Sequence, residues 1–375
     1  MIKKSIGLLA GMLVTVAVYA AGAQLRADHP DTYTVRSGDT LWDISAKFLS
    51  KPWLWPEIWQ ANPQVRNPHL IYPGDVLNLS FINGPRLKLE PSAHREAEAV
   101  PAIPLDQLHM FLKDMRVMDS NAVSSAPYVV GFEEARLRGA VGQNLYVRGL
   151  KSAPGQRWAI VRSTHVFRGY EQDDASDAGN GIVAHDMDSN VAMVRSPWSE
   201  DSRGDGHYSR GDDLGVEVSV IGTAEMLRDG DPSTLLLLDA TQEIRAGDRV
   251  MPIDDTPYDP YFYPHAPQAV PANARVIDLA DALDAAGRRQ VVALSIGAKD
   301  GVDNGQTYAI FQSGETIHDD VASNSWNRGV GENVTLPAEF VGHVMVFRTF
   351  DRVSYGLIMD GLRPVHRGAR LAMPE

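Results

Sequence analysis

The segment Tyr-Thr-Val-Arg-Ser-Gly-Asp-Thr-Leu-Trp-Asp-Ile, residues 33–44, decides the fold at the amino end of this 375-residue chain. Residues 33–35 alternate polar and apolar side chains like a short strand. Residues 36–39 then form a turn in which Gly38 supplies the necessary backbone freedom. A strand followed by a tight turn is therefore expected.

A short amphipathic helix should follow the turn directly. Thr40 with Asp43 three residues later is typical of a helix start, although the Asp39 side chain is an alternative cap. The helix positions that face one side are Leu41, Ile44, Ser45 and Phe48.

The next thirty residues add a second helix and a second turn. Pro56 suits the first position of a helix over residues 57–61, which Asn62-Pro63 ends. A Pro-Gly turn at residues 71–75 leads into an alternating strand at residues 76–79. The predicted order is strand, helix, helix, strand.

These motifs, Y-x-V-x-x-G-D-T-L-x-x-I, then N-P, then I-x-x-G-x-x-L-x-L, resemble the LysM family of modules that bind N-acetylglucosamine glycans. The resemblance covers residues 33–79 and implies a βααβ module with a shallow groove between two loops. It implies peptidoglycan binding through Gly38, Asp39, Thr40, Leu41, Asn62, Pro63, Ile71 and Tyr72. Backbone amides and carbonyls of two turns suit a neutral N-acetyl group, which offers one donor, one acceptor and a methyl.

Four of the seven tryptophans fall in this module, which leaves two interpretations open. Trp42, Trp53 and Trp55 either stack on sugar faces or supply the aromatic bulk that so small a module needs. Trp42 lies one residue off the apolar stripe, so partial exposure is expected there, whereas Trp59 is expected in the core.

The first 23 residues are typical of a cleavable signal peptide: two lysines, a short apolar run, and Ala21-Gly22-Ala23. We therefore expect export to the periplasm and no stable membrane span after cleavage. Loss of Lys3 and Lys4 makes the net charge of −13 more negative by two. So acidic a surface repels phosphate backbones, which argues against nucleic acid as a partner.

The remainder divides by composition into several regions. The predicted boundaries are a signal peptide at 1–23, the LysM module at 31–80, a flexible linker at 81–103, a helix and connector at 104–126, a β-rich repeat at 127–253, a Pro/Tyr-rich spacer at 254–273 and a second β-rich repeat at 274–374. The spacer is either an extended connector or an aromatic arm lying across a partner.

Internal similarity carries the prediction of two repeats. Residues 155–160 (GQRWAI) match 305–310 (GQTYAI), and residues 235–250 match 355–371 in their apolar and glycine positions. Gly215 is aligned with Gly342. The fold class is thus multidomain: a βααβ LysM module followed by two small β-barrels or sandwiches.

No catalytic site is predicted. The chain has no cysteine, and its eleven histidines form neither H-x-H nor H-E-x-x-H. The nearest approach to a serine elbow, around Ser295, has Ala293 in place of the first glycine. We expect a non-enzymatic envelope protein with no cofactor and no metal, whose β-rich repeats either contact another envelope protein or simply space the tether. The alternatives are a peptidoglycan hydrolase with an unrecognised site and an assembly factor for an envelope machine.

Overall fold

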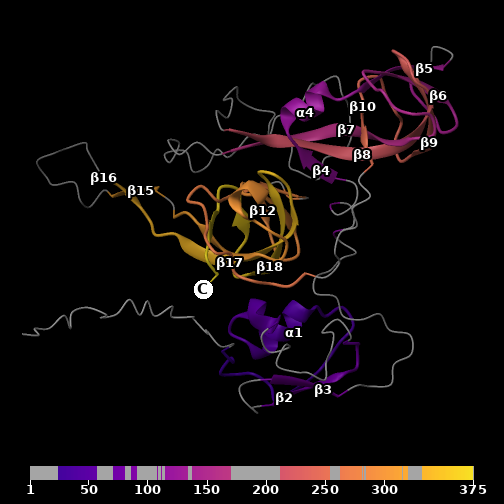
Figure 1. The fold of residues 1–375 in the computed structure, drawn as a ribbon. Coiled ribbons are helices and arrows are strands. Elements are labelled where there is room, and N and C mark those ends of the chain that lie inside the picture. Colours follow the sequence, from indigo (N-terminus) through magenta and orange to yellow (C-terminus); the bar gives the residue numbers. More distant parts are fainter. Residues whose placement is uncertain are drawn as a thin grey trace, which may run out of the picture. The chain divides into compact units, whose positions relative to one another are not determined.

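In a computed structural model the chain forms two compact units, residues 1–100 and 101–375 (Figure 1). The residues that it describes are 24–56, 71–80, 86–90, 108, 111, 115–133, 137–169, 212–253, 262–280, 282, 284–314, 316–319 and 332–374. The predicted signal peptide, the predicted helix at 57–61 and the groove residues Asn62 and Pro63 lie outside them.

The first unit contains a small antiparallel sheet and a helix. Its elements are β1 (Thr32–Thr34), α1 (Leu41–Phe48), the 3-10 helix η1 (Pro52–Leu54), β2 (Val76–Ser80) and β3 (Arg86–Glu90). The strand order is β1-β2-β3, and Tyr33 lies opposite Leu77. The predicted first strand, helix and closing strand are therefore confirmed.

Strand β3 corrects the predicted linker. Residues 86–90 pair with the whole of β2, from Val76 opposite Glu90 to Ser80 opposite Arg86. The alternation Arg-Leu-Lys-Leu-Glu is that of a half-buried strand, but Pro85 and Pro91 on either side concealed it. The prediction of a linker is wrong over these residues.

Helix α1 buries the face that the sequence predicted. Leu41, Ile44, Ser45 and Phe48 are all buried, and the Thr40 side chain accepts a hydrogen bond from the Asp43 amide. Thr40 is thus the cap, and the alternative that Asp39 caps the helix is wrong.

The second unit is β-rich and contains two main sheets. The first comprises β4 (Met115–Met118), β5 (Tyr128–Phe132), β6 (Asn144–Arg148), β7 (Arg157–Arg168), β8 (Asp213–Arg228), β9 (Ser233–Ala240) and β10 (Arg249–Pro252). Strand order β4-β8-β7-β10-β5-β6-β9 is completed by a β8–β9 pairing, which joins the last six strands in a ring. Aliphatic side chains from these strands fill its interior.

The second sheet has the order β11-β13-β18-β17-β14-β20. Its elements are β11 (Val276–Leu279), β13 (Val291–Leu294), β14 (Thr307–Gln312), β17 (Glu339–Thr349), β18 (Ser354–Gly361) and β20 (Arg370–Ala372). A bridge between Arg275 and Arg370 connects the first and last strands. Smaller elements are β12 (Ala285–Ala286), η4 (Ala298–Asp300), β15 (Thr316–Asp319), β16 (Glu332–Thr335) and β19 (Val365–His366).

Equivalent hydrogen bonds relate the two sheets residue by residue. Val129 exchanges backbone bonds with Gly247 and Asp248, as Val276 does with Gly368 and Ala369. Ile160 faces Gly222, as Ile310 faces Gly342.

These pairings correct one alignment made from the sequence. The counterpart of Gly342 is Gly222, not Gly215, because β8 runs past the ring and Gly215 lies on its extension beside β4. The extension begins with Gly215-Val216-Glu217-Val218, a glycine-led strand that resembles Gly342-His343-Val344-Met345 in sequence.

The region before the first sheet also differs from the prediction. Leu108 and Phe111 are buried, as a docked helix would require, but Met115 lies in strand β4. A six-residue helix, α4 (Ser120–Ser125), follows β4 instead. The apolar spacing that suggested one helix through Met115 therefore spans a change of structure.

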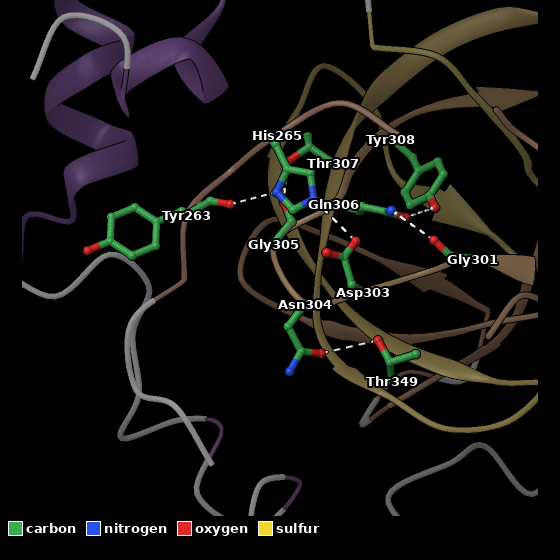
Figure 2. A network of polar contacts seen from close by, with 10 residues as sticks. All are labelled: Tyr263, His265, Gly301, Asp303, Asn304, Gly305, Gln306, Thr307, Tyr308 and Thr349. Carbon is green, nitrogen blue, oxygen red and sulfur yellow. Dashed lines mark hydrogen bonds and ion pairs between the residues drawn. The ribbon is translucent and has the colours of Figure 1, made fainter. Parts of the chain in front are cut away.

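The described part of the Pro/Tyr-rich spacer packs against the second sheet. Phe262 is 2% exposed, and residue 265 forms a parallel bridge with residue 306. Figure 2 shows the His265 ring between the Tyr263 carbonyl and the Asp303 carboxylate, at 2.9 and 3.2 Å. Over residues 262–267 the spacer therefore lies along the chain's own second sheet.

Candidate functional site

The first turn of the predicted groove is held by one carboxylate. Asp39 Oδ2 accepts hydrogen bonds from the Arg36 amide at 2.8 Å and from the Tyr33 hydroxyl at 2.9 Å. Gly38 has a φ of 85°, a conformation that glycine adopts without strain. Burial, together with the bond to Asp39, raises the pKa of the Tyr33 phenol above its ordinary value.

The second turn repeats this construction. Asp75 Oδ2 accepts from the Tyr72 amide at 2.9 Å, and Gly74 has a φ of 97°. The Asp75 amide donates to the Tyr72 carbonyl at 3.0 Å, which closes the turn. Both turns thus read x-x-Gly-Asp, with the aspartate fixing the amide three residues before it.

The two turns lie at the same end of the β1–β2 pair. Val35 donates to the Asp75 carbonyl at 2.9 Å and accepts from the Gly74 amide at 2.8 Å. Because β1 and β2 are antiparallel, the turn that leaves β1 meets the turn that enters β2. The structure therefore brings the two predicted sides of the groove together.

The predicted site residues divide into surface and support. Gly38 is exposed, and Asp39 and Tyr72 are partly exposed. Thr40, Leu41 and Ile71 are at most 4% exposed, so they form the floor and framework beneath the turns. A neutral ligand would meet mainly turn backbone and the Tyr72 ring.

The described tryptophans of the first unit belong to its core. Trp42, Trp53 and Trp55 are 1%, 3% and 1% exposed. Trp42 and Trp53 pack together with ring centroids 6.5 Å apart, and the Lys51 ammonium lies 5.9 Å from the Trp53 ring. The expected partial exposure of Trp42 is wrong, and no open ring face supports sugar stacking by these three residues.

Sequence reasoning missed two supports of the site. The Tyr33–Asp39 bond and the buried Asp75 carboxylate fix the turns, although neither Tyr33 nor Asp75 was predicted as a site residue. The repeated pattern, Arg-Ser-Gly-Asp and Tyr-Pro-Gly-Asp, is the signal that would have identified both turns.

Among the described residues, no helix combines the length and apolar character needed to span a bilayer. In the same part of the chain, no three histidine or acidic side chains gather as ligands for a metal ion.

Comparisons with known proteins agree with the geometry of the turns. Residues 33–80 match the model of the LysM domain. The chain is also 40% identical over 60 residues to the uncharacterized protein YqbP of Bacillus subtilis (strain 168), an alignment that covers 13% of this chain and 27% of that protein. The chain thus spans about a quarter of the relative's length. It is a LysM domain protein, and that domain implies peptidoglycan binding.

Proposed function

We propose that this is an exported, non-enzymatic protein of the periplasm that holds glycan strands of peptidoglycan through its LysM domain. The observation that carries the proposal is the pair of joined Gly-Asp turns within the residues that match the LysM model. The β-rich unit would then be the part that the tether presents to other envelope proteins.

The chemistry of the turns suits N-acetylglucosamine. Two backbone turns offer amides and carbonyls in fixed positions, and the Asp39 and Asp75 carboxylates are occupied in holding those turns. An N-acetyl group needs one donor, one acceptor and a small apolar contact, all without charge. Asn62 and Pro63, predicted from the family resemblance, would complete the second side.

The β-rich unit is suited to present a defined surface to another envelope protein, because a buried contact joins its two sheets. Glu217 of β8 is 0% exposed and accepts from the Thr164 hydroxyl at 2.6 Å and the Tyr355 hydroxyl at 2.5 Å. The Tyr355 ring packs edge-on against Phe111 and Phe350, with centroids 5.7 and 5.0 Å away. Buried polar groups with complete partners favour one defined arrangement.

A single shallow domain binds weakly, so durable attachment would need a second contact. The absence of cysteine removes thiol chemistry, and no serine elbow or zinc spacing occurs in the sequence. These sequence features support a binding role over hydrolysis of the wall.

Sedimentation with purified sacculi tests the proposal. Replacing Tyr72 with alanine removes the partly exposed ring but keeps the backbone amide that bonds to Asp75. We expect at least ~10-fold weaker retention, equivalent to ~1.4 kcal/mol of binding free energy. A Gly38/Asp39/Thr40 triple-alanine variant should lose retention as well, and the exposed Lys47→Ala on α1 is the matched control.

Retention of both groove variants at the level of the Lys47→Ala control, with unchanged circular dichroism, would refute glycan binding at the turns. Release of soluble muropeptides by the unaltered protein would refute the non-enzymatic part. Fractionation of cells that places the protein in the cytoplasm would refute export.

A further inference from the structure

Strands β7 and β8 run beyond the ring of the first sheet as a two-stranded extension. We define this β7–β8 extension as residues 163–168 and 213–218, which pair antiparallel with each other. One side of it packs with Val123 of α4 in a common apolar cluster. The other side carries His165, Phe167 and Glu217, which meet the second sheet.

The β7–β8 extension lies on the outer face of β11, β13 and β18. The His165 ring nitrogen is 2.9 Å from the Asp278 carboxylate of β11. The ring centroids of Phe167 and Tyr355 of β18 are 6.4 Å apart, and Glu217 accepts a hydrogen bond from the Tyr355 hydroxyl. Because β13 lies between β11 and β18, these contacts span the face.

Side chains on this outer face are buried although they do not belong to the interior core. Ile277 of β11 is 1% exposed, and Ala293 of β13 and Leu357 of β18 are 0% exposed. Successive residues of a strand point to opposite sides, so these three point away from the interior. Their burial therefore comes from an interface and not from the ring's own core.

The equivalent face of the first sheet is partly exposed to solvent. Strands β5, β6 and β9 take the places of β11, β13 and β18 in the strand order. The counterparts of Ile277, Ala293 and Leu357 are Val130, Tyr146 and Leu236. Val130 is 37% exposed, and the other two are partly exposed. One face is thus buried in the second sheet and open in the first.

The second sheet has its own two-stranded extension. Strands β15 and β16 continue β14 and β17 beyond the ring, as the β7–β8 extension does in the first sheet (Figure 1). The two segments stay close together before β15, since a Cβ on Gly314 would lie 2.0 Å from the Leu336 carbonyl oxygen. We define the arm as residues 313–314, 316–319 and 332–338.

Apolar side chains of the arm are exposed. Ile317 lies opposite Val334, so both are on one side of the arm, and they are 42% and 40% exposed. Ile317 follows Ile310 by the same number of residues as Phe167 follows Ile160. Within the described ranges, β15 and β16 pair only with each other. A two-stranded sheet with an exposed apolar pair is suited to association with another surface.

We propose that the arm binds the open face of the first sheet in a second copy of this chain, as the β7–β8 extension binds the second sheet within one copy. Ile317 takes the place of Phe167, and Val130 becomes covered as Ile277 is. Both surfaces are exposed in the single chain, so they do not cover each other within it. The contact joins two different surfaces, which makes the association head-to-tail and open to further copies. It does not depend on glycan binding, although joined copies would present several LysM domains together.

Charge agrees with this choice of partner. Residues 313–338 contain four acidic side chains and one arginine. On the open face, Tyr128 has Arg148 and Arg249 as its cross-strand neighbours. The Arg249 guanidinium lies 5.4 Å from the Tyr128 ring, and Arg148 shares an exposed pair with Asp231 at 3.4 Å, which contributes little by itself. An acidic arm and a face with two arginines attract each other, which would orient the contact.

Sedimentation velocity over a range of protein concentrations tests the proposal, with the chain from residue 24 onward, which retains all described residues. We expect association that Ile317→Asp on the arm and Val130→Asp on the face each weaken at least ~10-fold, because each places a charge in an apolar contact. Leu362→Asp is the matched control, since Leu362 is 80% exposed and belongs to neither surface. Circular dichroism should be unchanged in all three variants, because the replaced side chains are exposed.

A mixture of the two weakened variants distinguishes head-to-tail from symmetric association. Ile317→Asp keeps an unaltered face and Val130→Asp keeps an unaltered arm, so together they should form a mixed pair that does not grow further. A chain that stays monomeric at every concentration would overturn the proposal, as would variants that associate like Leu362→Asp. A mixture that associates no more than either variant alone would overturn it as well, because each surface would then meet its own counterpart.

Discussion

The two main sheets share one order of strands, but equivalent positions in them carry side chains of different chemistry. The first buries an ion pair: Arg162 and Asp248, each 3% exposed, make two bonds of 2.7 Å. Their counterparts in the second sheet are Gln312 and Ala369, which carry no charge. The first sheet also leaves one end open, whereas the second closes it with residues 296–304.

This difference teaches that formation of the ring of strands depends on backbone pairing and on the aliphatic interior more than on any one buried ion pair. The shared backbone bonds of Val129 and Val276 recur whether the partner residue is Asp248 or Ala369. What the sheets do not share is therefore free to serve binding, which agrees with function residing in sites carried by a common fold.

The largest expected effect comes from breaking the buried ion pair. Replacing Asp248 with alanine leaves the Arg162 guanidinium buried without its carboxylate, and it also removes the acceptor of the Arg245 amide at 2.6 Å. We expect a loss of about 3–5 kcal/mol in the stability of the first sheet. Hydrogen exchange of the β7 and β8 amides measures it locally.

The double variant Arg162→Gln, Asp248→Ala tests the comparison itself, because it installs the residues of the second sheet in the first. Neutral residues in place of a buried pair are often tolerated, so most of the lost stability should return. If the double variant were as unstable as Asp248→Ala alone, the two sheets would not be interchangeable at this position.

A smaller effect is expected at the paired bulges of the long strands. A Cβ on Gly342 would lie 2.2 Å from the Asp360 carbonyl oxygen, and one on Gly222 would lie 2.7 Å from that of Asp239. Alanine at either position should cost about 1–3 kcal/mol, with the greater cost at Gly342. Thermal unfolding of the two variants compares them directly.

Gly131, at the bulge of β5, is the control for this pair, since nothing lies within 4 Å of its added Cβ. Its alanine variant should change stability by less than about 0.5 kcal/mol. Equal costs at all three glycines would show that close backbone approach is not what selects glycine at the bulges.

The sequence was most informative where local chemistry determines structure. The Gly-Asp turn and the Thr40 cap act within four residues, so the start of the LysM domain followed from residues 33–48. The closeness of the two turns did not follow from spacing, because it depends on the pairing of β1 with β2. Only the family resemblance connected the two sides of the groove.

Features that depend on distant partners were harder to predict. Gly215 and Gly222 both lie in one 16-residue strand, and only their pairing distinguishes the ring glycine from the one beside β4. Likewise, Trp42 is off the apolar stripe of α1, yet Trp53 of the following 3-10 helix covers it. Tertiary contacts override the local pattern in both cases.

The smallest expected effect on stability is confined to alkaline pH. It distinguishes the two sheets because only the second has buried tyrosines at the positions compared. Burial raises the pKa of Tyr308 and of Tyr355 in the second sheet, and nearby carboxylates raise both further. Their counterparts in the first sheet, Trp158 and Thr234, do not ionise in this range. Because the folded pKa exceeds the unfolded value of about 10, this contribution is complete below pH 10 and is lost as the pH rises through the folded pKa.

The second sheet should therefore lose stability above about pH 10 while the first is affected less. Tyrosinate absorbance during alkaline titration measures this, because Tyr308 and Tyr355 should ionise only as the second sheet opens. Tyr308→Phe and Tyr355→Phe should each remove one tyrosine from that late, unfolding-linked step. If either variant instead reduced the early step, the phenol concerned would be open to water in the folded protein, and the closed end of the second sheet would differ less from the open end of the first.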